Sequence, residues 1–429
     1  MKQSAVRIVQ ILREHGFTAF WAGGCVRDML MHVQPEDYDI VTNADRGQVR
    51  NIFRRTIPVG EQFGICIVVF EGQQYEIAEF RHSPPDSALD EMIREDSLHR
   101  DFSINSMIYD PIEDRIYDYA GGRDDLRAGL IRGTENPRER FLEDRLRLAR
   151  AVRFAASLNY TIEETTFSAM QDLAPDIVLV SAERIREELL KILLSPLPLY
   201  GIDLLDQSGL LRYILPEVFA MKGVQQDPEF HPEGDVFEHT RRMLQLMKNV
   251  SPELAMAVLL HDIGKAPTCT KTDRIRFHGH ASRGAEIADE LCLRLKFSTK
   301  STERIVRLVR EHQKFLDVMQ MKTSSLKRFL RQEYFPELLE LHRLDCLSSQ
   351  RSLVHYHFCQ NMLKDFQQEA IYPPRLLSGK DLLQLGFTPG PQFTLMLNAV
   401  EDAQLEGTVA SKEDALELLK ELEGTFSCP

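Results

Sequence analysis

Two glycines and two aspartates near the N-terminus have the types and spacing that chemistry on a phosphate requires. Gly23 and Gly24 follow an apolar run and precede residues with helical spacing. A strand that turns through glycines into a helix leaves backbone N–H groups to bind a phosphate. One residue, Tyr38, separates Asp37 from Asp39, so on a strand their carboxylates would share one face. Because adjacent carboxylates repel unless a cation lies between them, and Mg²⁺ prefers such ligands, the pattern predicts metal-assisted transfer from a nucleoside triphosphate.

These residues stand in the order G-G-x-V-R-D and then D-x-D-I, with Arg27 in the first motif. The order resembles the signature of polymerase-β-type nucleotidyltransferases. More narrowly, it resembles that of the tRNA nucleotidyltransferase (CCA-adding enzyme) and poly(A) polymerase family, class II. The resemblance implies that Asp37 and Asp39 are catalytic ligands of Mg²⁺, and that Gly23, Gly24 and Arg27 bind the triphosphate.

A third carboxylate is expected on a β-hairpin, which the β-rich stretches 65–71 and 74–81 predict around Gly72-Gln73. Glu76 and Glu79 have opposite parity in the second stretch, so only one of them can share the face of the metal site. The family's corresponding strand supplies its third carboxylate at the position of Glu76, and the resemblance therefore adds Glu76 to the catalytic group. Glu79 is expected to be solvated or ion-paired.

A second motif, His99-Arg100-Asp101-Phe102-Ser103-Ile104-Asn105, resembles the family's R-R-D-F-[ST]-x-N, with His99 in place of the first arginine. In the family this motif contacts the ribose and phosphates of the incoming nucleotide, which implies the same for Arg100 and Asp101. Without the neighbouring motifs, a structural Arg–Asp pair at the start of a strand would be the usual interpretation.

A charged helix is predicted over residues 137–158, with Glu143, Arg147 and Arg150 on one face and Asp144 beside it. Solvated salt bridges usually explain such a face. The stretch is similar to the family's E-D-x-x-R-x-x-R element, whose Asp and first Arg present a Watson–Crick-like edge to the base. Because arginine donates a fork and aspartate accepts, the pair matches C or A. The resemblance implies that Asp144 and Arg147 read the base, oriented by Arg150 and Glu143.

A separate set of metal-ligand types lies in the C-terminal half: His239, His261, Asp262, His280, His312 and Asp345. The order H…H-D…D is that of HD-type metallophosphohydrolases, and His280 and His312 match the extra histidines of their two-metal versions. Imidazole and carboxylate together suit Mn²⁺, Fe²⁺, Ni²⁺ or Co²⁺, so a second divalent transition metal is expected here. Catalytic turnover does not follow, because such modules can persist as scaffolds.

The elements that must position these residues follow from the same resemblance, which implies an α+β fold in four parts. They are a polymerase-β-type nucleotidyltransferase head with a mixed sheet and helices, an all-helical neck, an HD body and a helical tail, over residues 1–135, 136–200, 201–350 and 351–429. In the neck, Ser181–Leu189 resembles the family's S-x-E-R-I-x-x-E-L. In the tail, Arg375 and Lys380 are candidates for contact with tRNA, although a solvated surface is the simpler expectation.

The composition is that of an ordinary globular protein. A chain of 429 residues with 43% hydrophobic and 27% charged residues predicts two to four domains. The net charge of −13 is a whole-chain average, which does not exclude local basic patches for RNA. No apolar run is long enough for a membrane span and no signal-peptide core is present. Seven scattered cysteines without CxxC spacing favour reduced thiols, and we expect a cytoplasmic protein.

The resemblance spans the whole chain and implies template-independent addition of nucleotides from CTP, ATP or both to the 3′ end of tRNA. Between Arg81 and Asp96 the segment is shorter than in CCA-adding members, and the basic pair before the proline is reduced to His82-Ser83-Pro84. In the family a shortened loop accompanies CC addition, which is therefore favoured over A addition and poly(A) synthesis. Two alternatives remain: an HD phosphohydrolase acting on nucleotides or 2′,3′-cyclic phosphates, and an RNA-binding scaffold with both sites inactive. The oligomeric state does not follow from the sequence.

Overall fold

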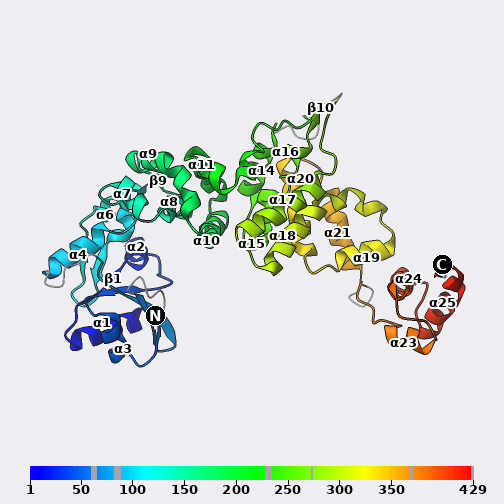
Figure 1. Cartoon of the computed structure of the whole chain (residues 1–429), viewed down its shortest axis with the longest axis horizontal. Helices are drawn as coiled ribbons and strands as arrows, with labels where there is room; N and C mark the ends of the chain where they lie inside the picture. The colour runs from blue at the N-terminus through cyan, green and yellow to red at the C-terminus, as the bar shows by residue number, and fades with distance from the viewer. Residues whose placement is uncertain (59–64, 82–87, 228–233, 272–273, 367–370, 427–429) are drawn as a thin grey trace. The chain divides into compact units, whose positions relative to one another are not determined.

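The structure, a computed structural model, describes residues 1–58, 65–81, 88–227, 234–271, 274–366 and 371–426 (Figure 1). Its contacts divide the chain into two compact units, Met1–Phe219 and Ala220–Pro429. The finer division into four parts stays a prediction. The stretch His82-Ser83-Pro84, on which the expectation of a shortened loop depends, lies outside the described residues. Among the residues that are described, no helix is long and apolar enough to cross a membrane.

The first unit begins with a seven-stranded mixed sheet in the order β3-β4-β5-β2-β1-β6-β7. The strands are β1 Ala19–Ala22, β2 Asp39–Thr42, β3 Thr56–Pro58, β4 Ile65–Phe70, β5 Gln73–Glu79, β6 Ile108–Asp110 and β7 Arg115–Tyr117. The central pair β2 and β5 is parallel, with Ile40 opposite Ile77. The other neighbours are antiparallel. The mixed sheet with its helices confirms the predicted fold class.

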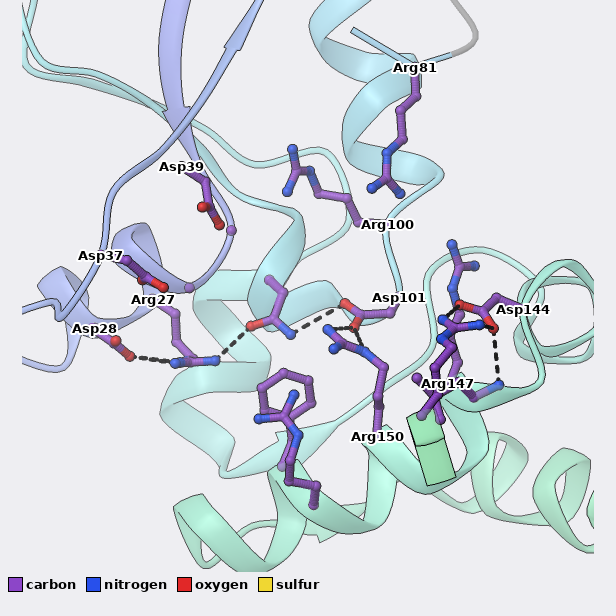
Figure 2. A pocket seen from close by; sticks show the side chains of 17 residues that line it. Arg27, Asp28, Asp37, Asp39, Arg81, Arg100, Asp101, Asp144, Arg147 and Arg150 are labelled. Carbon is purple, nitrogen blue, oxygen red and sulfur yellow. Dashed lines mark hydrogen bonds and ion pairs between the residues drawn. The ribbon is translucent and has the colours of Figure 1, made fainter. Parts of the chain in front are cut away.

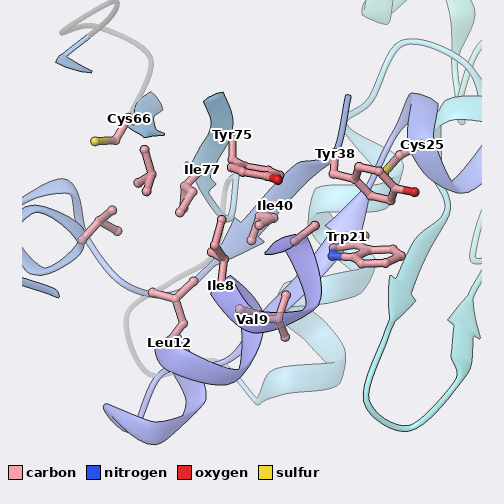
Figure 3. Close-up of a cluster of buried hydrophobic side chains, with 14 of the residues drawn as sticks. Ile8, Val9, Leu12, Trp21, Cys25, Tyr38, Ile40, Cys66, Tyr75 and Ile77 are labelled. Atoms are coloured by element: carbon pink, nitrogen blue, oxygen red, sulfur yellow. The ribbon is translucent and has the colours of Figure 1, made fainter. Parts of the chain in front are cut away.

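The two faces of this sheet have different roles. On one face α1 (Lys2–Glu14) and α3 (Arg46–Ile52) cover a core that includes Trp21 and Ile40 (Figures 1 and 3). Because side chains alternate along a strand, Asp39 lies on the opposite face from Ile40. That opposite face packs a smaller apolar cluster against α4 (Leu89–Leu98). The acidic residue is therefore held at the edge of a packed layer, away from the main core.

Two local details of the head differ from the sequence-based expectation. The β4–β5 turn is Glu71-Gly72, one residue earlier than predicted, with φ of 50° and 78°. Positive φ at both central residues is the geometry of a tight type I′ turn, which glycine favours. Asp37 precedes β2, which begins at Asp39, so only one of the two aspartates is on the strand.

Helices and one short strand pair complete the first unit. They are α2 Gly24–Leu30, α5 Ser103–Ser106, α6 Gly122–Ala128, α7 Pro137–Glu143, α8 Leu146–Leu158, α9 Glu164–Leu173, η1 Ala174–Leu179, α10 Ala182–Leu193, α11 Pro198–Gln207, α12 Leu210–Ile214 and α13 Pro216–Phe219, with β8 Leu130–Ile131 parallel to β9 Thr161–Ile162. Because β9 lies inside the predicted neck, that segment is not entirely helical.

The prediction of one helix over residues 137–158 is wrong. The helix breaks at Asp144, whose backbone is extended with φ −143° and ψ 104°. The side chain of Asp144 accepts a hydrogen bond from the backbone N–H of Leu146, 3.1 Å away, as a helix-capping residue does. Aspartate competes for backbone N–H groups in this way, which favours a new helix start over a continuous helix.

The second unit is mostly helical. Its helices are α14 Val236–Leu246, α15 Pro252–Leu260, α16 Lys265–Thr268, α17 His280–Arg294, α18 Thr299–Glu311, η2 His312–Gln320, α19 Thr323–Leu330, α20 Phe335–Ser348, α21 Val354–Asp365, α23 Gly379–Gln384, α24 Pro391–Glu406 and α25 Lys412–Phe426. The unit also contains a short antiparallel pair, β10 Thr270–Lys271 and β11 Ile275–Arg276. All six cysteines in the described residues are free.

Candidate active site and metal centre

The glycine turn places backbone directly beside the charged residues of the head. Gly23, at the N-terminus of α2, has φ of 76°, a conformation that favours glycine. A Cβ at this position would lie 3.2 Å from Nη1 of Arg100 and 3.6 Å from Oδ2 of Asp39. The turn therefore brings a bare backbone next to one cation and one carboxylate, which is the approach that a phosphate and a metal need.

A cavity of about 470 Å³ collects residues from both the head and the following helices. Seven arginines and five aspartates are among the residues that line it. Ten of the predicted site residues are in this lining: Gly23, Gly24, Arg27, Asp37, Asp39, Arg100, Asp101, Asp144, Arg147 and Arg150. Figure 2 shows Asp37 and Asp39 on one side of the cavity and Asp144 and Arg147 on the other.

Glu76 is not in the cavity lining, but it acts electrostatically on Asp39. Burial raises the pKa of Asp39 to about 6, and the negative charges of Asp37 and Glu76 add to the effect, while Arg100 opposes it. In the parallel register Ile40 faces Ile77, so Glu76 lies beside Asp39 at the start of β2. Glu79, by contrast, is opposite Thr42. Three like charges at one place favour a bound cation.

Arg100 is fixed by a residue to which sequence analysis assigned no role, Asp96. Its Nε and Nη2 donate to Oδ2 of Asp96 at 2.9 and 2.8 Å. The backbone N–H of Arg81 donates to Oδ1 of the same carboxylate at 3.2 Å. Asp96 is fully buried, so a single carboxylate positions two arginines of the cavity. The i, i+4 spacing of Asp96 and Arg100 was the available indication.

Asp101 and Arg150 are at the centre of a chain of polar contacts. Arg150 donates from Nε and Nη2 to Oδ2 of Asp101 at 2.9 and 2.6 Å. Asn105 donates to Oδ1 of Asp101 at 3.3 Å and accepts from Arg27 at 2.9 Å. Burial alone would raise the pKa of Asp101, but the contacts with Arg150 outweigh it and lower the pKa to about 2. Arg150 is thus paired with Asp101, and its Nη1 also lies 4.0 Å from Oε1 of Glu188.

Arg147 is held by three oxygen atoms. Its Nη1 donates to the backbone oxygen of Arg140 and to Oε2 of Glu143, both at 3.1 Å, and its Nη2 donates to the backbone oxygen of His99 at 3.1 Å. A guanidinium has five donors, so Nε–H and one Nη2–H are left for the cavity. Glu143 thus orients Arg147 across the break in the helix, even though it does not line the cavity.

Asp144 pairs with Arg184, a residue that sequence analysis placed in the neck packing. Arg184 donates from Nη1 to Oδ1 at 3.2 Å and from Nη2 to Oδ2 at 2.7 Å. Burial acts to raise the pKa of Asp144, but the hydrogen bonds from Arg184 and Leu146 and the charges of Arg184 and Arg147 together outweigh it, and the pKa is lowered. Spacing could not reveal this pair, because 40 residues separate its members.

The six predicted metal ligands of the second unit come together in one buried cluster. Two sets of ligand atoms lie within 4.8 Å of one another, His239 with His261 and Asp262, and Asp262 with His280 and His312. Asp345 joins the cluster through His239, with Oδ1 3.2 Å from Nε2. We call these six residues the histidine cluster.

The imidazole rings of the histidine cluster are oriented as metal ligands are. Nδ1 of His261, His280 and His312 lies 3.0, 2.9 and 2.6 Å from a backbone carbonyl oxygen three residues earlier. Nδ1 must donate in these contacts, so in the neutral ring the Nε2 lone pair is directed to the cluster. Burial lowers the pKa of His312 to about 4, so this ring is neutral at pH 7. A set of acceptors directed at one another fits a cation.

Two cations border the histidine cluster. Lys265 donates to Oδ2 of Asp262 at 2.6 Å and to Oε1 of Gln226 at 2.6 Å, and Arg351 pairs with Asp345. Both cations line a cavity of about 60 Å³ together with Asp262 and Asp345. This space is enough for an ion with a few waters.

Comparisons with known proteins decide the family. Three family models match: Poly A polymerase head domain at residues 19–132, Probable RNA and SrmB-binding site of polymerase A at 159–222, and HD domain at 236–349. The chain is 30% identical over 417 residues to the CC-adding tRNA nucleotidyltransferase of Thermus thermophilus, covering 92% of each protein. It is 31% identical over 419 residues to the A-adding tRNA nucleotidyltransferase of Deinococcus radiodurans, covering 92% of this chain and 93% of that protein.

The chain belongs to the tRNA nucleotidyltransferase and poly(A) polymerase family. It is therefore an enzyme that transfers nucleotides, with the divalent-metal dependence of that family. The Bacillus stearothermophilus CCA-adding enzyme in complex with CTP has the same fold, with a TM-score of 0.73 at 24% identity over 99% of this chain and 98% of that one. The Thermotoga maritima CCA-adding enzyme complexed with tRNA matches with a TM-score of 0.62 at 19% identity, over 97% and 94%.

Proposed function

We propose that this enzyme adds nucleotides from CTP or ATP to the 3′ end of tRNA without a nucleic-acid template. One observation carries the proposal: a single cavity holds both the carboxylates of Asp37 and Asp39 and the pair Asp144 and Arg147. A site for metal-assisted transfer and a site for base reading that share a cavity can act on the same nucleotide. The relatives, named as CC-adding and A-adding tRNA nucleotidyltransferases, support tRNA as the acceptor.

Mg²⁺ fits the head carboxylates, and we assign it to Asp37, Asp39 and Glu76. The raised pKa of Asp39 comes from burial and then from the other two negative charges, and a divalent cation would remove that repulsion. When bound, Mg²⁺ supplies activation of the terminal 3′-hydroxyl and neutralisation of charge on the leaving pyrophosphate. The strand register places Asp39 beside Glu76 on one face of the sheet, and the backbone of Gly23 approaches the carboxylate of Asp39.

The triphosphate is assigned to the glycine turn and its arginines. Gly23 and Gly24 line the cavity at the start of α2, and Arg27 and Arg100 line it as well. Fixed donors and cations in a partly dry site stabilise phosphate charge without having to reorganise. Asp101 is assigned an indirect part, since its carboxylate is already paired with Arg150.

Base selection is assigned to Asp144 and Arg147, which would replace the template. Arg147 keeps Nε–H and one Nη2–H as donors, and Asp144 accepts only. Cytosine presents an amino group beside ring N3, and adenine presents one beside ring N1. Each base therefore offers a donor to Asp144 and an acceptor to Arg147.

For the product, we propose CC addition ahead of A addition and poly(A) synthesis. The short segment after Arg81 supports this order, while relatives of both the CC-adding and the A-adding kind are about equally similar to the chain. The test supplies labelled tRNA that lacks its 3′ end with CTP alone, ATP alone or both, and measures product length on a sequencing gel. Two added cytidines with no adenosine are expected. Ready addition of A to a tRNA that ends in CC would refute the CC-only product.

A second candidate function is metal-dependent phosphohydrolysis at the histidine cluster. The observation that favours it is the orientation of the rings, because Nδ1 bonds to backbone carbonyls direct Nε2 of His261, His280 and His312 toward Asp262. We assign a transition metal such as Mn²⁺ or Co²⁺ to this cluster. Lys265 and Arg351 at its border would hold a phosphate group of the substrate.

Two substitutions separate these functions. Asp37→Ala should abolish nucleotide incorporation and leave transition-metal content, measured by elemental analysis, unchanged. His261→Ala should lower metal content and leave incorporation intact. Loss of incorporation only in the His261 variant would reverse the assignment. An inactive RNA-binding scaffold is disfavoured, because the carboxylates and the base-reading pair are both present in one cavity.

A further inference from the structure

Arg184 lines the base-reading side of the cavity without any role in the proposed function. It lies in the first turn of α10 and reaches Asp144 at the break between α7 and α8. Two parallel hydrogen bonds join its Nη atoms to the two carboxylate oxygens, at 3.2 and 2.7 Å. Such a fork restricts the carboxylate to one rotation about its terminal bond.

Stability does not explain this pair. The side chains of Arg184 and Asp144 are 50% and 34% exposed, and ion pairs with this exposure contribute little to folding. The pair instead decides which acceptor positions of Asp144 remain open. Oδ1 already accepts from Arg184 and from the backbone N–H of Leu146, whereas Oδ2, within the described part of the chain, accepts only from Arg184. Each carboxylate oxygen accepts two hydrogen bonds, so one position on Oδ2 is left.

The remaining position can accept from an exocyclic amino group but cannot serve a carbonyl. Asp144 is ionised at neutral pH, because an aspartate is ionised there at its ordinary pKa and the pKa of Asp144 is lowered further, and an ionised carboxylate has no proton to donate. Cytosine and adenine present an amino group at this edge. Uracil and hypoxanthine present an oxygen there. This oxygen and Oδ2 of Asp144 are both acceptors, so no hydrogen bond can form between them.

We propose that Arg184 is a positioning residue that sets base selectivity, because it holds Asp144 as a fixed acceptor for the amino group of the incoming base. The inference rests on the proposed function, in which Asp144 and Arg147 read the base. It predicts that Arg184 affects the choice between nucleotides more than the rate of transfer of the correct one.

The test replaces Arg184 with methionine, which keeps an unbranched apolar stem and removes the guanidinium donors. The readout is kcat/KM for one nucleotide added to tRNA, compared within a pair that differs by amino against oxo: CTP with UTP or, if the enzyme incorporates ATP, ATP with inosine triphosphate. We expect the selectivity ratio to fall by about tenfold to a hundredfold, with a smaller fall in Arg184→Lys. Thermal unfolding should show the Arg184→Met protein folded.

Arg138→Met is the matched control. Arg138 also pairs with an aspartate, Asp172 at 3.3 Å, in the same unit and on exposed side chains, but it does not line the cavity. The selectivity ratio of the Arg138→Met enzyme should equal that of the unsubstituted enzyme. An equal fall in this control would overturn the proposal, because loss of any surface ion pair would then suffice.

Asp144→Asn distinguishes failure of this inference from failure of the proposed function. We expect Asp144→Asn to lower the ratio and Arg184→Met to add nothing in that background. If Asp144→Asn lowers the ratio while Arg184→Met leaves it unchanged, the role of Arg184 is refuted and base reading stands. An independent, multiplicative effect of Arg184→Met also refutes the role. If neither variant changes the ratio, base reading by Asp144 fails as well.

Discussion

At the scale of single residues, the cavity depends on buried carboxylates that no nucleotide needs to touch. Asp96 is the plainest case, since it is fully buried and its side chain fixes the guanidinium of Arg100 beside Asp39 and Gly23. Leaving a buried guanidinium without its carboxylate partner costs free energy, and the side chain is then no longer held in one orientation.

Asp96→Asn should therefore lower kcat/KM for nucleotide addition by about tenfold or more, mainly through a higher KM for the triphosphate, because Arg100 is released. Steady-state kinetics with varied nucleotide measure this change. Asp124→Asn is the control, because Asp124 forms an exposed pair with Arg127 in α6. Equal kinetics in the Asp96 variant and the unsubstituted enzyme would show that Arg100 needs no such anchor.

Asp101 gives the same unit a defined acid sensitivity. Its pKa of about 2 in the folded state lies below the ordinary value near 4, so its contribution of about 2 kcal/mol is complete above pH 4 and is lost as the pH falls toward 2. The difference in free energy of unfolding between the unsubstituted protein and Asp101→Asn should shrink over that window. Denaturant titrations at a series of pH values measure it, and a constant difference would contradict the pKa.

Spacing identified the chemistry-bearing residues of the head, and most of them line one cavity. These residues could be identified from spacing because each motif lies within one short local segment, such as the glycine turn at the start of α2. Arg184 was missed as a site residue for a physical reason, because 40 residues separate it from Asp144 and a sequence pattern does not encode such a partner. Asp96 is different: it stands four residues before Arg100, and this spacing was an indication that the sequence analysis did not use.

At the scale of elements, the periodicity of hydrophobic residues predicted where strands and helices lie better than it predicted breaks within a helix or very short strands. Hydrophobic spacing continues across Asp144, so the helix break there could not be seen, although aspartate is a good capping residue. The pairs β8–β9 and β10–β11 have two residues per strand, which is too short for alternation to be detected.

In the second unit, the backbone at Gly264 packs closely against the backbone of α17, and this contact can be tested. A Cβ on Gly264 would lie 2.1 Å from the backbone oxygen of His280 and 2.5 Å from the backbone nitrogen of Gly284. Gly264→Ala should therefore destabilise the second unit by about 2 to 3 kcal/mol and lower its metal content, because the segment that carries His261 and Asp262 must move from α17. Hydrogen exchange of α17 and elemental analysis measure the two effects.

Gly379→Ala is the matched control for this contact. At Gly379 the nearest atom to an added Cβ is a ring carbon of Phe393 at 3.8 Å, an ordinary contact. Stability in this variant should change by less than about 1 kcal/mol. A Gly264 variant as stable as this control would mean that the two backbones are not in close contact.

At the scale of the whole molecule, net charge and local charge have opposite signs. The chain carries −13, yet seven arginines line the head cavity. Net charge acts at long range and is screened by salt, whereas contacts with phosphates release counterions and weaken as salt rises. The two effects predict opposite responses of tRNA binding to ionic strength.

We expect the contacts between the arginines of the cavity and phosphates to dominate over the repulsion from the net negative charge. The kcat/KM for tRNA should therefore fall at least about tenfold between roughly 50 and 200 mM salt. The experiment measures initial rates at fixed nucleotide concentration, with thermal unfolding at the same salt concentrations as the control. A rate that rises with salt would show that repulsion by the acidic surface governs the encounter.

The hydrogen-bonded chain from Arg27 through Asn105 and Asp101 to Arg150 joins the two ends of the nucleotide site. A ligand that draws the guanidinium of Arg27 away from Asn105 leaves the amide oxygen of Asn105 without this donor. The amide is linked to Arg150 through Asp101, which accepts hydrogen bonds from both residues. In the proposed function the triphosphate binds at the Arg27 end of this chain of hydrogen bonds and the base lies toward the Arg150 end. A nucleoside monophosphate with the correct base is then expected to contact only the Arg150 end.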